Sequence, residues 1–379
     1  NTSANGVAVD GVTLKDGNVG AAGTATSVAG IPLFTADNSI YTHDVSGTDN
    51  TASFNTAYGI GALGAITDGD QSVAIGYGAG DATTTGRVLA IGKDAAGANT
   101  TGGAIIAIGD TAYDAADTEN YNIAIGTDAL GGAVAGGEYN VAIGHFSLDA
   151  NTSGDYSVAI GYEASSSSTT SGGNVCIGYQ AGKSITTGGG HLFIGELAGD
   201  NFDTENWNLG IGKNSLGGPI AGGEYNVAIG ANTLDALTSG DSNVAIGYDA
   251  GTALTTGTKH VFIGYSAGAS SVTNTDGSVC IGYQAGNALL NGGSVFVGPE
   301  TGKLVTTGSS NVMVGFAAGR NFDTENHNIG MGTFALGGAI AGGEYNVAIG
   351  GLALDALTSA DQTTALGHNA ATRLTTGSY

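Results

Sequence analysis

The stretch Ser157-Val158-Ala159-Ile160-Gly161 gives the pattern that decides the fold: an aliphatic residue, a small residue, an aliphatic residue and glycine. The pattern returns along nearly the whole chain. Its glycines lie at positions 61, 76, 92, 109, 126, 144, 161, 178, 195, 212, 230, 247, 264, 282, 298, 315, 332, 350 and 367. They are 15 to 18 residues apart, with a mean of 17. So constant a period over 19 copies predicts a repeat protein in which each unit mainly contacts its neighbours.

Each copy has the residue pattern of a β-strand. The residue before the repeat glycine is aliphatic in all 19 copies, and the residue three before it is aliphatic in 17. Alternate residues of a strand share one face, so we expect this aliphatic pair to be buried. The residue between them is Ala in ten copies and also Cys, Phe or Met, as at Cys176, Phe193 and Met313. Neither face is polar, which predicts that both are covered.

A second short element and a turn rich in Thr and Gly follow each repeat glycine. Examples are Asp128-Ala129-Leu130 and the turn Thr255-Thr256-Gly257. Seventeen residues would then hold two strands and two turns, which is one coil of a flattened solenoid. A three-sided hexapeptide helix needs an aliphatic residue every six positions, but Asp81 and Arg87 stand six and twelve after Ile75. The sequence therefore predicts an all-β fold, a parallel β-roll of about 19 coils.

The charge and composition exclude several classes of protein. The 379 residues include 33 acidic and 9 basic side chains, a formal charge of −24. Such a chain repels nucleic acid phosphates, so we expect no nucleic acid partner. No run of about 18 apolar residues and no signal peptide pattern occurs, so we expect no membrane insertion. The chain starts at Asn1 and stops within a repeat, and we expect it to be a fragment or a processed product.

Two regions follow from the extent of the repeat. Residues 57–379 form the β-roll array, and residues 1–56 form an N-terminal β segment without the repeat. Within that segment, residues 7–17 alternate apolar and polar side chains around Asp-Gly turns, which predicts a hairpin. The segment would cap the first coil or attach the array to another module.

The repeats resemble the head repeats of trimeric autotransporter adhesins and the related glycine-rich repeats of bacteriophage tail fibres. The resemblance rests on the pentapeptides Ser72-Val73-Ala74-Ile75-Gly76, Ser157-Val158-Ala159-Ile160-Gly161 and Asn226-Val227-Ala228-Ile229-Gly230, each with a small residue three places on. It implies a left-handed β-roll, a homotrimer and a place on a cell or virion surface. The adhesin heads have a shorter period, and their membrane anchor and stalk are absent here, which favours a virion fibre.

Catalytic, metal and cofactor sites are not indicated by the sequence. Cys176 and Cys280 occupy equivalent positions six coils apart, too far for a disulfide. The six histidines lie in different coils without ligand spacing. Carboxylates such as those of Asp68 and Asp70 could bind Ca²⁺, but the known calcium motifs are missing, so solvated turns are expected. We therefore expect no enzyme activity, no metal and no cofactor.

A two-coil block that occurs three times supplies the candidate binding residues. It covers residues 117–140, 203–226 and 323–346. One position varies among Tyr121, Trp207 and His327 while its neighbours barely change. Aromatic rings stack on sugars and anchor interfaces, so we expect a binding site at these three residues with Asp203, Glu205 and Asn206 beside Trp207. The alternative is that the aromatic residue only covers the edge of the neighbouring coil.

Together these features predict an extracellular structural and adhesive fibre, a phage tail fibre or other virion appendage that contacts a glycan or protein on a host surface. The alternatives are the head domain of a trimeric autotransporter adhesin, a glycan-degrading tailspike and a matrix filament. A tailspike would need paired acids in a cleft.

Overall fold

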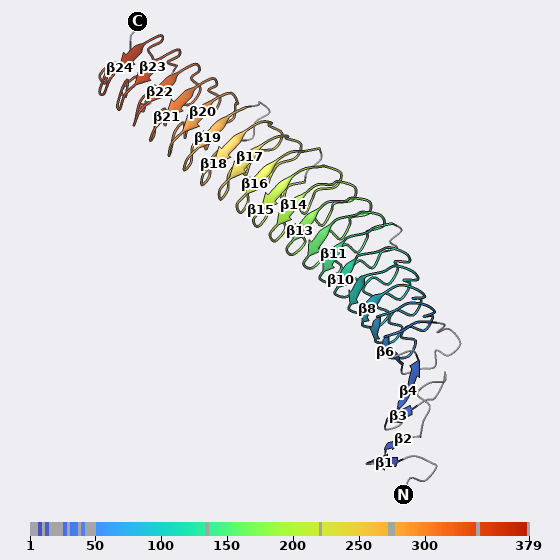
Figure 1. Cartoon of the computed structure of the whole chain (residues 1–379). Helices are drawn as coiled ribbons and strands as arrows, with labels where there is room; N and C mark the ends of the chain where they lie inside the picture. Colours follow the sequence, from blue (N-terminus) through green and yellow to red (C-terminus); the bar gives the residue numbers. More distant parts are fainter. Residues whose placement is uncertain are drawn as a thin grey trace. The chain divides into compact units, whose positions relative to one another are not determined.

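The computed structural model describes residues 7–9, 12–14, 26–28, 31–36, 39–41, 51–132, 136–219, 222–271, 277–338 and 342–376. The chain forms two compact units, residues 1–177 and 178–379. The regular elements of the described residues are all β-strands (Figure 1). The predicted all-β fold is confirmed.

Short antiparallel strands precede the array. Strands β1 (Val7–Val9) and β2 (Val12–Leu14) pair antiparallel, which confirms the predicted hairpin, although its turn lies outside the described residues. Strands β3 (Thr26–Val28), β4 (Ile31–Ala36) and β5 (Ser39–Tyr41) form an antiparallel series. Strand β5 also pairs in parallel with the first repeat strand, where the buried Tyr41 aligns with Ala57. The parallel ladder thus begins within the segment 1–56.

The array is a β-solenoid with one strand in each coil. The strands of the first unit are β6 (Thr56–Tyr58), β7 (Val73–Ile75), β8 (Val88–Ile91), β9 (Ile105–Ile108), β10 (Ile123–Ile125), β11 (Val141–Ile143), β12 (Val158–Ile160) and β13 (Val175–Ile177). Those of the second are β14 (Leu192–Ile194), β15 (Leu209–Ile211), β16 (Val227–Ile229), β17 (Val244–Ile246), β18 (Val261–Ile263), β19 (Val279–Ile281), β20 (Val295–Val297), β21 (Val312–Val314), β22 (Ile329–Met331), β23 (Val347–Ile349) and β24 (Thr364–Leu366). Neighbouring strands pair in parallel, as Val141 does with Val158. About 18 turns with a 17-residue period confirm the predicted solenoid.

The register of the first coil corrects the repeat alignment. Strand β6 pairs with β7 so that Tyr58 aligns with Ile75. Gly59, rather than Gly61, therefore occupies the position of Gly76. The backbone agrees, because Gly59 and Gly76 have φ values of 139° and 141°, whereas Gly61 has a φ of 77°.

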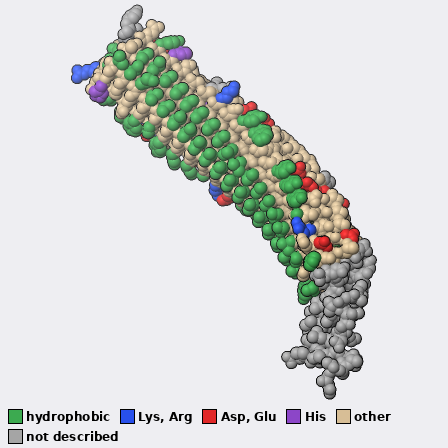
Figure 2. Space-filling model, viewed as in Figure 1, with side chains coloured by type: hydrophobic (Ala, Val, Ile, Leu, Met, Phe, Trp, Pro, Cys, Tyr) green, Lys and Arg blue, Asp and Glu red, His purple; other side chains and the backbone are tan. Residues whose placement is uncertain are grey.

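The two faces of the strand differ from the prediction. The middle residue is buried, as at Ala159 and Phe262, while the aliphatic residues on either side stay partly exposed. Ile75 and Ile349 keep 40% and 38% of their surface exposed. The predicted burial of the aliphatic pair is therefore wrong within one chain, because the narrow interior takes the middle residue and the branched pair points outward. Rows of hydrophobic side chains are visible on the outside of the array (Figure 2). We call the residues one and three before each repeat glycine the outer aliphatic face.

The second strand predicted for each coil is a series of turns instead. After the repeat glycine, Asp94 and Ala96 have φ values of 53° and 51°, in the left-handed region. A β-strand needs negative φ at every residue, so these dihedral angles exclude it. The turns still join the coils, since the Ala96 N–H donates to the carbonyl of Ala112 at 2.9 Å.

The middle strand residue and the residue four after the repeat glycine are complementary in size in several coils. Phe193 fills the middle strand position, and a Cβ on Gly199, four residues after the repeat glycine, would lie 2.4 Å from its ring. In the coil whose strand carries the small Ala124, the corresponding position holds the buried Leu130. In these coils a large residue at one of the two positions is matched by a small one at the other, because two large residues there would overlap.

A column of buried polar side chains precedes the strands. The Asn140 N–H donates to Asn122 Oδ1 at 2.8 Å, and the Ser157 N–H donates to Asn140 Oδ1 at 2.9 Å. Asn140 Nδ2 also donates to the carbonyl of Gly154 at 2.8 Å. These bonds satisfy backbone groups that the turn would otherwise leave buried without partners.

His191 takes the place of asparagine in this column. Its Nδ1 accepts the Asn208 N–H at 3.3 Å, and its Nε2 lies 2.8 Å from the carbonyl oxygen of Glu205. A neutral ring with the proton on Nε2 satisfies both contacts. Burial lowers the pKa of His191 to about 4, because the charged ring would lose its hydration.

The depressed pKa predicts a specific loss of stability in acid. Above the ordinary histidine pKa of about 6.5, His191 is neutral in both the folded and the unfolded chain, and its contribution to the free energy of unfolding is complete. As the pH falls from about 6.5 toward the folded pKa of about 4, the unfolded chain binds a proton at this histidine and the folded chain does not, so the free energy of unfolding decreases. We expect a loss on the order of 2–3 kcal/mol between pH 7.5 and 4. His191→Asn, with the residue found at Asn208 and Asn226, should remove this part of the pH dependence. Urea unfolding of both proteins at the two pH values measures the difference, and parallel losses would contradict it.

The two cysteines are interior residues of different units. Cys176 and Cys280 occupy the middle strand position, are fully buried and are free thiols. Burial raises the pKa of Cys176 to about 12 and also raises the pKa of Cys280.

We expect neither thiol to react with maleimide before the chain unfolds. The double variant Cys176→Ala, Cys280→Ala should assemble normally with or without reductant. Covalent multimers on non-reducing electrophoresis that disappear in the double variant would contradict this.

Candidate functional site

The residue five positions before the repeat glycine forms a surface column along the coils. Its aromatic members, the aromatic column, are Phe54, Tyr121, Tyr139 and Tyr156 in the first unit and Trp207, Tyr225, His327 and Tyr345 in the second. All eight are exposed and have φ values between 56° and 62°, in the left-handed region. Tyr121, Trp207 and His327 were predicted from the sequence but the other five were not, although their constant distance from the repeat glycine was a usable signal.

Most of these rings stack on one another. The ring centroids of Tyr121 and Tyr139 are 4.9 Å apart, and those of Tyr139 and Tyr156 are 5.2 Å apart, with interplanar angles of 9° in both pairs. His327 and Tyr345 stack at 4.9 Å. The spacing follows from the distance of about 4.8 Å between neighbouring strands. Stacking restricts the rings and holds their outer edges in fixed positions.

Trp207 lies against the backbone of the preceding coil. A Cβ on Gly190 would stand 2.5 Å from Trp207 Cε3, so the indole covers this glycine. The side chain is nevertheless 61% exposed. It therefore covers the edge of a neighbouring coil and still presents a large aromatic surface to solvent.

The polar neighbours of Trp207 mainly hold the turn together. Glu205 is only 4% exposed, and its carboxylate accepts the N–H groups of Asp203 at 2.9 Å, Thr204 at 3.1 Å and Gly222 at 2.8 Å. The other copies of the block repeat this arrangement at Glu119 and Glu325. Glu205 lies inside the turn and cannot reach a surface ligand.

Asp203 and Asn206 remain at the surface beside Trp207. Asp203 is exposed, and its carboxylate accepts a hydrogen bond from the Thr186 hydroxyl. Asn206 Oδ1 accepts the Gly189 N–H at 3.0 Å, and its Nδ2 donates to Glu224 Oε1 at 3.1 Å. The structure thus brings Asp203, Asn206 and Trp207 to one surface turn, while Tyr121 and His327 lie in other coils.

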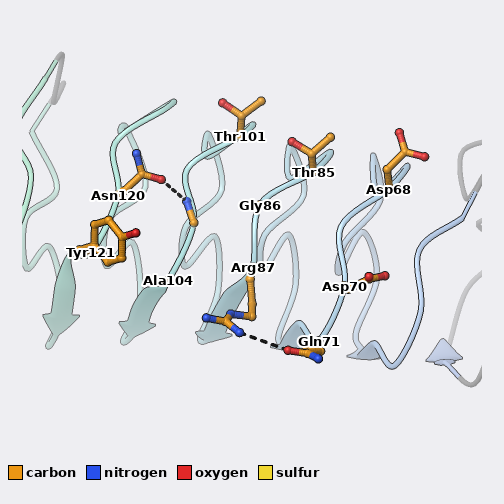
Figure 3. A pocket seen from close by; sticks show the side chains of 11 residues that line it. Asp68, Asp70, Gln71, Thr85, Gly86, Arg87, Thr101, Ala104, Asn120 and Tyr121 are labelled. Carbon is orange, nitrogen blue, oxygen red and sulfur yellow. Dashed lines mark hydrogen bonds between the residues drawn. The ribbon is translucent and has the colours of Figure 1, made fainter.

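A groove that was not predicted from the sequence crosses four coils of the first unit next to Tyr121. It has a volume of about 480 Å³ and is lined by Asp68, Asp70, Gln71, Thr85, Gly86, Arg87, Thr101, Gly103, Ala104, Asn120 and Tyr121 (Figure 3). Along one side of the groove, Arg87 Nη1 donates a hydrogen bond to Gln71 Oε1 at 3.2 Å. The only sequence signal was the small Ala104 between the large Arg87 and Tyr121 of successive coils.

Carboxylates are numerous but do not gather around a metal position. The described residues contain no group of three or more His, Cys, Asp or Glu side chains able to hold a metal ion. Burial raises the pKa values of Asp114 and Asp149, and the negative charge of Asp128 raises both further. This repulsion reflects the acidic character of the chain and does not create a cleft.

Comparisons with known proteins leave the resemblance as a prediction. No protein-family model matches the chain, and no curated protein matches it significantly. Within the ranges that the structure describes, no helix is long and apolar enough to cross a membrane.

Proposed function

We propose that the chain is an extracellular structural and adhesive fibre that assembles as a homotrimer and belongs to a virion appendage such as a phage tail fibre. The observation that carries the proposal is the outer aliphatic face. Coil after coil exposes branched aliphatic side chains on the outside of the strands, as at Ile143 and Ile160, both half-buried. A large exposed apolar surface with a regular pattern is typical of an interaction site.

Association of chains along this face would remove the exposed surface from water. Each square ångström of apolar surface buried contributes about 25 cal/mol, and the contribution accumulates coil by coil. The net charge of −24 opposes association, but the outer aliphatic face is uncharged, so the acidic turns can stay in solvent. The repeats that resemble trimeric adhesin heads and tail fibres support three chains and a position on a virion surface.

Adhesion is assigned to the turns that carry the aromatic column. These turns face solvent and present rings beside hydrogen-bonding groups, as Trp207 does beside Asp203 and Asn206. Aromatic residues anchor interfaces because they bury a large surface at low cost in side-chain entropy. The repetition of such turns along a fibre gives many weak contacts and therefore strong attachment.

Trp207→Ala tests the adhesive function. We expect retention of the fluorescently labelled protein on a panel of bacterial cells to fall by about tenfold, because the loss of an aromatic anchor costs more than about 1 kcal/mol per contact. The melting temperature should hardly change, since the ring is mostly exposed and Ala104 shows that alanine adopts this backbone conformation at a φ of 59°.

Gln362→Ala is the matched control, because Gln362 is exposed at the same column position with a φ of 54° but is not aromatic. Its attachment should equal that of the unaltered chain. A large fall in melting temperature for Trp207→Ala, with attachment reduced only in proportion, would make Trp207 a structural residue and refute the assignment.

A further inference from the structure

The groove beside Tyr121 exists because one coil carries a small residue in the surface column. Arg87, Ala104 and Tyr121 occupy this column in three successive coils, as the strand pairing shows. Ala104 leaves a gap between its two large neighbours, and Gly86 and Gly103 keep the adjoining wall low. Further along the column the rings of Tyr121, Tyr139 and Tyr156 are in stacking contact, and no such gap remains.

Tyr121 closes one end of the groove with an aromatic surface. One face of its ring is stacked on Tyr139, which in turn is stacked on Tyr156. The side chain is still 55% exposed and lines the groove, beside Ala104 in the close view (Figure 3). The stack holds the ring in place before any ligand arrives, so little side-chain entropy is lost on binding.

Polar side chains line the rest of the groove. The hydroxyls of Thr85 and Thr101 are exposed in successive coils. Arg87 is held by its hydrogen bond to Gln71, which leaves further guanidinium N–H groups available as donors.

At the far end, Asp68 and Asp70 provide carboxylate acceptors. Asp68 Oδ1 accepts the Thr51 hydroxyl at 2.9 Å, and Asp70 Oδ1 accepts the Ser53 N–H at 2.7 Å. Both side chains are exposed, and these bonds fix their orientation. The groove therefore combines an aromatic ring, hydroxyls, a planar cation and two carboxylates in one open channel.

We propose that this groove binds a neutral oligosaccharide, which rests on the proposed adhesive function and names its ligand class. A pyranose ring has an apolar C–H face that would pack on Tyr121 and hydroxyl groups that would pair with Arg87, Asp68 and Asp70. The coil spacing of about 4.8 Å is close to the length of one pyranose unit, so consecutive sugars can meet equivalent groups of consecutive coils. Two carboxylates against one guanidinium, on a chain of charge −24, disfavour an anionic sugar.

The test is binding of the full chain to cellohexaose, maltohexaose and chitohexaose by calorimetry, and to an array that carries both neutral and anionic glycans. Tyr121→Ala should weaken binding by about tenfold or more, and Tyr121→Phe should keep most of it because the ring remains. Ala104→Gln should also abolish binding by filling the gap, although it removes no group. Glutamine fits this backbone, since Gln71 and Gln362 adopt φ values of 59° and 54° at the same column position. Gln362→Ala, at the same column position in another coil and outside both the stack and the groove, is the control and should bind normally.

The outcomes separate this inference from the function on which it rests. Absence of binding by the unaltered chain to every neutral glycan at millimolar concentration would overturn the inference, and so would normal binding by Ala104→Gln. Binding only to anionic glycans, lost in Arg87→Gln, would overturn the neutral ligand class. If cells retain the protein but Tyr121→Ala and Ala104→Gln change nothing, the groove is refuted while the adhesive function stands. If neutral glycans bind at the groove but no cell retains the protein, the adhesive function is refuted instead.

Discussion

Gly144→Ala is expected to destabilise the first unit by about 4 kcal/mol or more, among the largest effects that a single substitution produces. Gly144 has a φ of 136°, and a Cβ on it would lie 2.3 Å from the carbonyl oxygen of Gly161 in the next coil. The Cα of Gly144 and the carbonyl oxygen of Gly161 belong to stacked backbones, so neither can move away without changing the spacing between the coils. The same approach recurs at Gly126, Gly178 and Gly195, where an added Cβ would lie 2.6, 2.3 and 2.4 Å from a backbone carbonyl oxygen of the next coil. This explains why the repeat glycine is the constant element of the period.

Gly173→Ala is the control for Gly144→Ala. Gly173 also has a positive φ, 71°, but a Cβ there would meet nothing within 4 Å. Only the conformational strain of about 1 kcal/mol is then expected. Urea unfolding followed by circular dichroism compares the two variants at equal concentration. If Gly144→Ala costs no more than Gly173→Ala, close backbone stacking is not what requires the repeat glycine.

Ile143→Lys combined with Ile160→Lys is expected to separate the chains of the proposed trimer. The two residues lie on the outer aliphatic face of adjacent coils, where Ile143 aligns with Ile160. Both are partly exposed within one chain, so lysine should leave the coil folded. Inside an interface, however, the same ammonium groups would be buried without partners, which costs several kcal/mol for each ion.

Light scattering compares this double variant with Ser153→Lys and Thr170→Lys together, which add the same charge at exposed turn positions of the same two coils. The control should keep the mass of the unaltered chain, and the interface variant should fall to 36.8 kDa. An interface variant that keeps the larger mass would place the contact elsewhere.

The period and the strand positions could be predicted because each coil repeats one strict requirement. Close stacking excludes a side chain at the repeat glycine, and this marks every coil in the sequence. The inner and outer faces could not be assigned from the strand alone, since all three of its residues are apolar. The information lay elsewhere: Phe193 pairs with Gly199, and Ala124 pairs with Leu130, so the middle residue shares the interior with the residue four after the glycine.

The candidate site was only partly predictable. Tyr121, Trp207 and His327 are exposed, as a binding role requires, because a left-handed residue before the strand carries its side chain outside the coil. Glu205 looked equivalent to its polar neighbours in sequence, yet three backbone N–H groups hold its carboxylate inside the turn. The groove depends on residues from four coils and on the small size of Ala104, which no single repeat reveals.

The most direct test of the account is the mass of the unaltered chain in solution. The outer aliphatic face is proposed to be covered by other copies of the chain, so multi-angle light scattering at micromolar concentration should give about three times 36.8 kDa. A stable, soluble species of 36.8 kDa under these conditions would show that the face is not a subunit interface and would contradict the proposed trimeric fibre.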